Sequence, residues 1–198
     1  FAPYIAKIKA SGADTIITGN WGADLALLVK AAKDAGLNAN FYTYYAGTTG
    51  VPTAMGAAGA DHVRQVNYWQ PNDSVVNPQP IVEGFKKKFN DDYYVMATYT
   101  AFKFLSEAMK KAKSTEPLKV ALAMEGLKVQ SLNGEVEMRA SDHQAQQAVY
   151  ISSWQKVDGK TVKYDQENTG YGWRTEAKLD SYVAAQPTSC QMKRPAAQ

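Results

Sequence analysis

Cysteine is nearly absent from this sequence. Its 198 residues include one cysteine, Cys190, which lies in the polar stretch PTSCQ at residues 187–191. A single thiol excludes an internal disulfide, and its polar surroundings place it outside any predicted core. Two interpretations remain open: an inert thiol in a surface tail or, in a secreted protein, a thiol that pairs with a cysteine elsewhere.

A strong charge of one sign and a long apolar run are lacking as well. The net charge of +3 gives no argument for a nucleic-acid partner, and the basic run at residues 86–88 is interpreted as a solvated helix face. No apolar run reaches about 18 residues, so no membrane-spanning helix is expected, and no secretory signal pattern is present. The chain starts at Phe1 rather than at a methionine, and we expect a processed or truncated product.

Signatures of catalysis and of cofactor binding are also missing. The sequence has no G-x-S-x-G elbow and no phosphate-binding P-loop, and the glycines at residues 19–22 lack the spacing of a dinucleotide site. The two histidines, His62 and His143, each follow an aspartate and are interpreted as structural residues rather than metal ligands. We therefore expect a binding protein rather than an enzyme, with no cofactor and no metal.

The most informative stretch that is present runs from residue 13 to residue 36. A β-branched run at residues 15–18 predicts a buried strand, residues 19–22 break it, and apolar residues at helical spacing follow, closed by Gly36. This is half of a β-α-β unit, and ligands of open α/β sheets bind beyond the carboxyl ends of the strands. Trp21, in the turn after the strand, is therefore predicted to contact a ligand; the alternative is a ring folded over the sheet edge.

The rest of the chain predicts a parallel sheet covered by helices, followed by a second lobe. The early order is helix 1–11, strand 15–18, helix to 36 and strand 40–45, so the strand that should precede the first helix is missing. The later predictions are a short helix at 52–55, a strand at 62–69, a crossing segment at 70–80, helices at 81–90, 95–113 and 117–125, a hairpin at 129–139 turning at Asn133–Gly134, a second hairpin pairing 148–156 with 161–167, and surface from 168 onward.

Aromatic residues gather next to predicted loops. Small-molecule sites are lined mainly by apolar and aromatic side chains with a few polar groups. Taken singly, each tyrosine is more often a core or rim residue, but several at the ends of separate segments indicate a binding site. The residues in question are Trp21, Tyr44, Tyr45, Trp69, Tyr93 and Tyr94.

Five segments together resemble the second half of type I periplasmic solute-binding proteins, and within them the branched-chain amino-acid binding group of ABC importers. No single motif is diagnostic, but the order and spacing of the segments are specific, and the resemblance covers nearly the whole chain. The segments are FAPYIAKIKASGAD at 1–14, TGNWGADLALLVKAAKDAGL at 18–37, FYTYYAG at 41–47, YVMATY at 94–99 and NGEVEMRASDHQ at 133–144.

The resemblance implies a two-lobed α/β fold whose amino-terminal half is missing here. Residues 1–66 would form part of the carboxyl-terminal lobe and residues 67–130 part of the amino-terminal lobe, and residues 131–198 would supply a hinge crossing, return strands and a tail. The missing half, or a swapped second chain, would complete the fold and could offer a partner for Cys190.

The resemblance also implies a solute site and a mechanism. Trp21 and Tyr94 would sandwich the apolar part of a solute, Tyr45 would offer a hydroxyl, and Asn20 and Tyr44 would lie beside them. Amino-acid binders of this family place an acid where this chain has Tyr45, so a carboxylate or a neutral solute fits at least as well as a branched-chain or aromatic amino acid.

The function implied is that of the periplasmic solute-binding component of an ABC importer, which closes on its solute by a hinge motion and is read by the membrane permease. One alternative is a ligand-sensing domain of the same fold in a receptor or regulator. Another is a flavodoxin-like enzyme, which a bound nucleotide or measurable turnover would favour.

Overall fold

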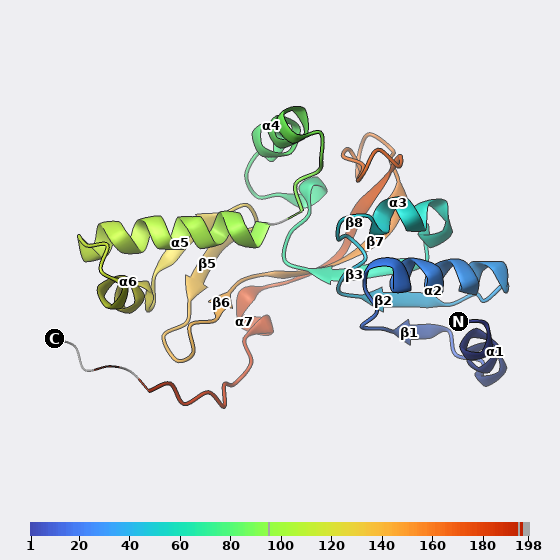
Figure 1. Ribbon diagram of the computed structural model, residues 1–198, viewed down its shortest axis with the longest axis horizontal. Coiled ribbons are helices and arrows are strands. Elements are labelled where there is room, and N and C mark those ends of the chain that lie inside the picture. The colour runs from blue at the N-terminus through green and yellow to red at the C-terminus, as the bar shows by residue number, and fades with distance from the viewer. Residues whose placement is uncertain (95, 194, 196–198) are drawn as a thin grey trace. The chain divides into compact units, whose positions relative to one another are not determined.

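The computed structural model describes residues 1–94, 96–193 and 195, and these form two compact units (Figure 1). Unit 1 comprises residues 1–94 and 150–178, and unit 2 comprises residues 95–149 and 179–198. The chain therefore passes from one unit to the other three times, after Tyr94, after Val149 and after Lys178.

Unit 1 is built on a five-stranded mixed sheet with the strand order β1-β2-β3-β7-β8. Strands β1, β2 and β3 run parallel, with Ile16 opposite Phe41, and β3 pairs antiparallel with β7. Its elements are α1 (Ala2–Ser11), β1 (Thr15–Ile17), α2 (Gly22–Asp34), β2 (Asn40–Thr43), α3 (Val51–Met55), the 3-10 turns η1 (Gly56–Gly59) and η2 (Pro71–Asp73), β3 (Val63–Asn67), α4 (Gln79–Phe89), β7 (Val149–Lys156) and β8 (Tyr171–Leu179).

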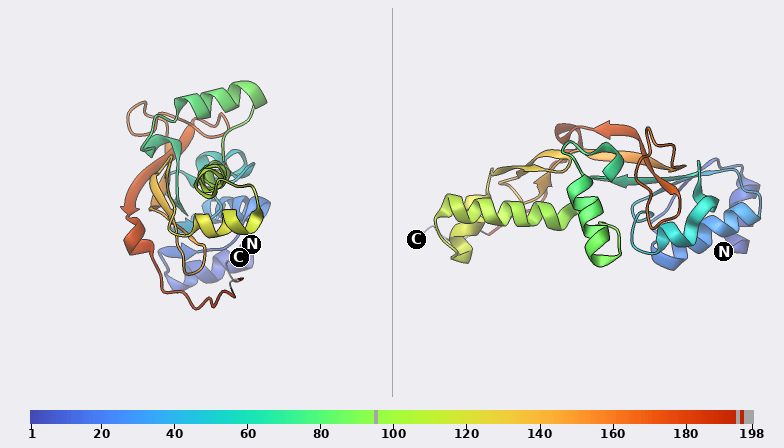
Figure 2. Two further views of the ribbon diagram at one scale, coloured as in Figure 1. Left: turned by 90° about the vertical axis from the view of Figure 1, so that its left-hand side faces the viewer. Right: turned by 90° about the horizontal axis from the view of Figure 1, so that it is seen from above.

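The core of unit 1 lies between this sheet and the first helices. Helices α2 and α3 lie on the same side of the strands (Figure 2), and the apolar face of α2 predicted from its spacing, Leu25, Leu28, Val29 and Ala32, is buried as expected. Trp154 of β7 is fully buried, its ring centroid lies 4.9 Å from that of Trp173, and its Nε1–H donates to the Gly56 carbonyl at 2.8 Å.

Gly36 ends α2 as the sequence predicts. It adopts the left-handed conformation at φ 62°, where glycine carries no Cβ penalty. Its N–H donates to the Lys33 carbonyl and the Leu37 N–H donates to the Ala32 carbonyl, the paired bonds of a Schellman motif. This closure fixes the helix that begins directly after Trp21.

Unit 2 contains a three-stranded antiparallel sheet with the order β4-β5-β6, on which α5 packs, and α6 packs on α5. The hairpin predicted around Asn133–Gly134 is present, with Ser131 opposite Gly134, and Phe104, Val129 and Val136 form its buried core. The elements are α5 (Met96–Ala112), α6 (Pro117–Met124), β4 (Lys128–Ser131), β5 (Gly134–Met138), β6 (Ala145–Gln146) and α7 (Ser181–Ala184). Residue 95, the predicted start of the long helix, lies outside the described residues.

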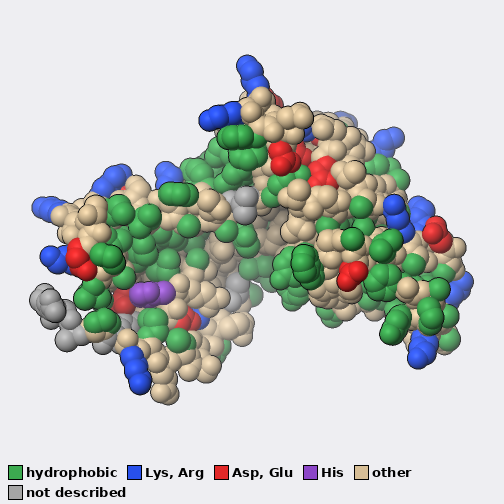
Figure 3. Space-filling model, in the orientation of Figure 1, with side chains coloured by type: hydrophobic (Ala, Val, Ile, Leu, Met, Phe, Trp, Pro, Cys, Tyr) green, Lys and Arg blue, Asp and Glu red, His purple; other side chains and the backbone are tan. Residues whose placement is uncertain are grey.

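One face of α5 leaves apolar side chains exposed. Phe102 and Leu105 are 67% and 37% exposed, and hydrophobic side chains are visible over this helix in Figure 3. Across the part of the chain that the structure describes, no helix is both long and apolar enough to cross a bilayer.

The prediction of a second hairpin is wrong in its second strand. Strand β7 neighbours β8, at residues 171–179, whereas residues 161–167 belong to the connection between them. Asp158 accepts hydrogen bonds from the three successive N–H groups of residues 160–162, and the Asn72 side-chain oxygen accepts from the N–H groups of residues 163 and 164. These five N–H groups therefore bond to side chains instead of to a neighbouring strand. Trp173, expected at the surface, is 3% exposed and belongs to the core.

The lobe boundaries expected from the sequence, at residues 66 and 130, do not coincide with the unit boundaries. The stretch 67–94 belongs to unit 1, where it contacts residues 150–178: Lys86 lies 3.7 Å from Asp165, and Gln70 Nε2 donates to Thr175 Oγ1 at 2.8 Å. Within the stretch, Trp69 lies edge-on to Tyr93, with the ring centroids 6.0 Å apart. The assignment of these residues to the lobes of a whole binding protein stays a prediction.

Candidate functional site

The five residues predicted to contact a solute all belong to unit 1, and four of them follow two neighbouring strands. Asn20 and Trp21 come after β1, and Tyr44 and Tyr45 come after β2. Because β1 and β2 are parallel neighbours, both loops leave the same edge of the sheet, where open α/β sheets bind ligands.

The aromatic side chains on these two loops face solvent. Trp21 is 72% exposed, Tyr44 59% and Tyr45 46%, and the rings of Tyr44 and Tyr45 lie 6.4 Å apart at a tilt of 60°. Trp21 therefore adds little to the core of unit 1. Asn20 is turned back toward the strand end: its N–H donates to Thr18 Oγ1 at 3.1 Å, and Thr18 Oγ1 donates in turn to its side-chain oxygen.

Tyr94 is in a different setting, because it is half-buried and its hydroxyl is engaged within the protein. Its O–H donates to Glu167 at 2.8 Å. Burial, followed by the hydrogen bond and the charge of Glu167, raises the pKa of Tyr94. The hydroxyl is therefore protonated and committed to Glu167, which leaves the ring as the part of Tyr94 that can face a solute.

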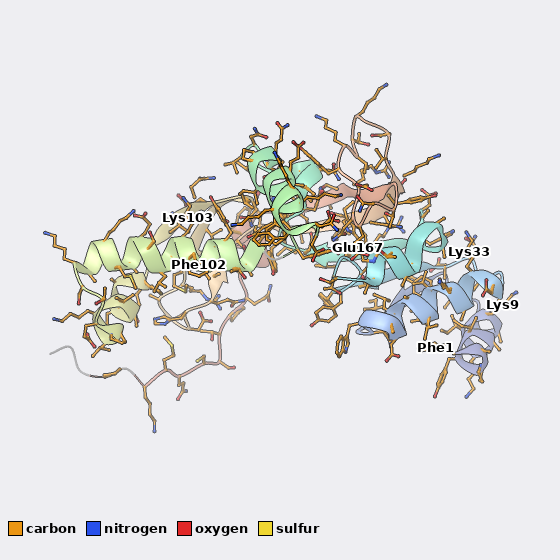
Figure 4. The ribbon with its side chains drawn as sticks, turned by 45° about the horizontal axis from the view of Figure 1, so that its top comes forward. Phe1, Lys9, Lys33, Phe102, Lys103 and Glu167 are labelled. Atoms are coloured by element: carbon orange, nitrogen blue, oxygen red, sulfur yellow. The ribbon has the colours of Figure 1, made fainter. Side chains whose placement is uncertain are left out.

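Glu167 is the residue that sequence reasoning missed. Its carboxylate accepts from Tyr94, from the Gly50 N–H at 2.5 Å, and from the Thr53 N–H and Oγ1 at 2.7 and 2.5 Å, so it caps the first turn of α3. Glu167 is labelled in Figure 4. Burial works against ionisation, but the hydrogen bonds from Thr53, Gly50 and Tyr94 outweigh it and lower the pKa of Glu167. More than a hundred residues separate Glu167 from Thr53, and the turn-forming residues beside Glu167 were the only sequence signal.

A hollow of about 410 Å³ lies beside this carboxylate. It is lined by residues of the segments 49–54, 90–94 and 167–168 together with Lys86. Of the five predicted contact residues, Tyr94 lines it and the other four do not. The structure thus joins Tyr94 to Glu167, while Asn20, Trp21, Tyr44 and Tyr45 lie on loops of one sheet edge.

Other residues considered from the sequence, Trp69 and His143, are engaged in packing or in contacts with charged side chains. Trp69 is 6% exposed and packs on Tyr93. His143 lies 3.0 Å from Glu125, and the neighbouring Asp142 pairs with Arg139. Among the described residues, no group of three or more histidine, cysteine, aspartate or glutamate side chains is arranged to hold a metal ion.

Comparison of the sequence with known protein families gives a match over most of the chain. Residues 1–163 match the profile of a family described as periplasmic binding protein. The chain belongs to the periplasmic binding protein family. The resemblance found in the sequence is confirmed, and so is the α/β fold class.

Individual members of the periplasmic binding protein family support this placement. The chain is 32% identical over 203 residues to Leu/Ile/Val-binding protein homolog 4 of Brucella abortus, covering 98% of this chain and 48% of that relative. It is also similar to the crystal structure, in a closed conformation, of the leucine-, isoleucine-, valine-, threonine- and alanine-binding protein of Brucella ovis, with a TM-score of 0.87 at 32% identity and coverage of 98% of this chain and 51% of that one.

A more distant structure shares the fold alone. This is a solute-binding protein of an ABC transporter from Rhodopseudomonas palustris in complex with 3,4-dihydroxybenzoic acid, with a TM-score of 0.74 at 20% identity, covering 91% of this chain and 49% of that one. The chain thus spans about half the length of the relatives that it matches.

Proposed function

We propose that this chain is part of the solute-binding component of an ABC importer, which captures a small amino acid or carboxylate in the periplasm and presents it to a membrane permease. The single observation that carries the proposal is membership of the periplasmic binding protein family along most of the chain. The solute classes to test are the branched-chain amino acids for which the Brucella abortus relative is named, and aromatic acids such as the 3,4-dihydroxybenzoic acid bound in the Rhodopseudomonas palustris structure.

The proposed mechanism is closure of two bodies on the solute. The similar binding protein of Brucella ovis is described in a closed conformation, and in a hinge closure a few residues absorb the change in backbone angles. A solute that contacts both bodies stabilises the closed form by its difference in affinity for the two forms.

The proposed contacts are Trp21, Tyr45 and Tyr94, with Asn20 and Tyr44 beside them. Exposed aromatic rings at one sheet edge favour an apolar or aromatic solute body, since they present large rigid surface to water. None of the five residues carries a carboxylate, and the four acceptor positions of Glu167 are filled by protein donors, so the ammonium of an amino acid would need an acid from elsewhere in the protein.

The test uses the full-length protein that contains this chain. Native mass spectrometry of the purified protein identifies a co-purified solute, and calorimetry with L-leucine, L-isoleucine, L-valine, benzoate and 3,4-dihydroxybenzoate measures affinity. We expect a member of this panel to bind and to reduce the radius of gyration in small-angle scattering. Turnover of a solute, or no binding by any member of the panel, would contradict the proposal.

The contact residues are tested by Trp21→Ala, Tyr45→Ala and Tyr94→Ala in the same protein. Each is expected to weaken binding about tenfold or more, because an aromatic contact surface is lost. Tyr182→Ala is the matched control, since Tyr182 is an aromatic residue of α7 that is 75% exposed and is not among the proposed contacts. Unchanged affinity in all three variants would remove the proposed site.

A further inference from the structure

The connection between β7 and β8, residues 157–170, holds the loop that carries Tyr44 and Tyr45. The Gln166 side chain donates through Nε2 to the Gly47 carbonyl at 2.8 Å, and Glu167 accepts from the Gly50 N–H three residues later. The same loop also lies against β3, because a Cβ at Gly47 would lie 2.4 Å from Oε1 of Gln65. The loop is therefore hydrogen-bonded to the connection and lies close to the sheet.

Glu167 also holds Tyr94, another of the proposed contact residues. One of its oxygens accepts from both Gly50 N–H and Tyr94 Oη, and the other accepts from Thr53 N–H and Oγ1. Four donors occupy the roughly four lone-pair positions of a carboxylate. The loop after β2 and the Tyr94 ring thus share one anchoring group.

The connection is itself fixed to the core of unit 1. Gln166 Oε1 accepts from the buried Trp173 Nε1 at 2.7 Å, and the Glu167 N–H donates to Asp92, which also pairs with Lys86. An anchor of this kind transmits the rigidity of the core to the loops, since each hydrogen bond fixes an orientation as well as a distance.

We propose that Gln166 and Glu167 are positioning residues of the solute site, which hold Tyr45 and Tyr94 in place without touching the solute. This rests on the function proposed above, because it takes Tyr45 and Tyr94 as solute contacts. Pre-organised loops bind more tightly, because less conformational freedom is lost when the solute arrives.

The first test needs no solute. In Glu167→Gln the carboxamide keeps one acceptor oxygen but turns an N–H₂ toward the donors of the other, so one side of the anchor is lost. We expect faster amide hydrogen exchange in peptides covering residues 44–55 of the full-length protein. The matched control is Asp158→Asn, because Asp158 also caps a turn of the same connection but accepts its hydrogen bonds from residues 160–162 rather than from residues 44–55. It is expected to leave exchange of residues 44–55 unchanged.

The second test measures affinity for whichever member of the solute panel binds the unaltered protein most tightly. Glu167→Gln is expected to raise Kd about tenfold, in line with the loss of a hydrogen bond to a charged group, while Asp158→Asn stays within about twofold. The double variant with Tyr94→Phe is expected to lose less than the product of the two single effects, because both single variants break the same Tyr94–Glu167 bond. Gln166→Met, which removes both Gln166 bonds at similar side-chain length, serves where Glu167→Gln fails to fold.

The outcomes separate this inference from the proposed function. If Tyr45→Ala and Tyr94→Ala weaken binding but Glu167→Gln does not, the positioning role is overturned and the proposed function stands, even where exchange of residues 44–55 is faster. If Tyr45→Ala and Tyr94→Ala have no effect, these two residues are not solute contacts and the positioning role fails, while the proposed function is decided separately by binding of the solute panel.

Discussion

At the scale of the residue, the tryptophans of unit 1 fall into two groups. Trp154, Trp173 and Trp69 are 0%, 3% and 6% exposed, and the first two pack on each other, whereas Trp21 is 72% exposed. Burial of an aromatic side chain contributes strongly to stability, while an exposed ring on a loop contributes little to it. Substitution of a buried tryptophan is therefore expected to lower the free energy of unfolding, and substitution of Trp21 is expected to leave it nearly unchanged.

Trp154→Phe is expected to lower the free energy of unfolding by about 1–3 kcal/mol, because the smaller ring leaves a gap and the Gly56 carbonyl loses its donor. Trp21→Phe is the matched control and is expected to change it by less than about 0.5 kcal/mol. Urea unfolding of the full-length protein measures both. Equal effects of the two substitutions would contradict the assignment of Trp154 to the core.

Glu167 predicts a pH dependence of stability. Its pKa is lower in the folded protein than its ordinary value of 4.5, so it binds its proton less readily when folded. Its stabilising contribution is therefore complete above pH 4.5 and is lost as the pH falls through the lower, folded pKa. Melting temperatures between pH 3 and pH 6 are expected to fall less steeply in Glu167→Gln than in the unaltered protein; parallel curves would contradict this.

At the scale of the element, Asn72 organises the connection between β7 and β8. Its Nδ2 donates to the carbonyls of Tyr164 and Trp173, and its Oδ1 accepts from the N–H groups of Lys163 and Tyr164. Three backbone groups of the irregular connection and the Trp173 carbonyl of β8 thus find partners in one side chain. This explains how a long connection without a strand of its own stays packed on the sheet.

Asn72→Ala is expected to destabilise the protein by about 2–4 kcal/mol, because it leaves several backbone groups without partners. Thermal unfolding gives the magnitude, and limited proteolysis is expected to cut first within residues 157–170. Asn77→Ala is the control: Asn77 is an exposed residue whose side chain accepts from the nearby Gln79 N–H, and a change below about 0.5 kcal/mol is expected. Cleavage elsewhere in both variants would argue against the role of Asn72.

The elements that the sequence predicted well are those with local causes. Helical spacing and the left-handed Gly36 define α2, and Asn133–Gly134 marks the hairpin of β4 and β5, because these signals act within a few residues. The connection at 157–170 and the Glu167 anchor could not be predicted in the same way. Their partners, Asn72 in one case and Thr53 and Tyr94 in the other, are remote in sequence, and alternating residues at 161–167 resemble a strand unless those partners are known.

At the scale of the whole molecule, the chain spans about half the length of its relatives, and its two units are linked by three passages of the chain. The proposed solute binding is a property of the full-length protein, of which this chain is a part. We therefore expect the 198-residue chain alone to bind the best solute of the panel at least about 100-fold more weakly than the full-length protein, a difference that calorimetry measures directly. Equal affinity of a proven monomer of these 198 residues would contradict this.

Strand β1 has a consequence for work with the 198-residue chain. In the described sheet it is the outermost strand, its three residues carry neither charge nor proline, and Ile17 is 79% exposed. The unpaired backbone N–H and C=O groups of an outermost strand can pair with the same strand of another copy. We therefore expect self-association that increases with protein concentration in light scattering. Ile17→Lys is expected to keep the chain monomeric, because a charged side chain on β1 opposes pairing with a second copy and lies outside the core. If the unaltered chain is monomeric at every concentration, the predicted self-association is wrong.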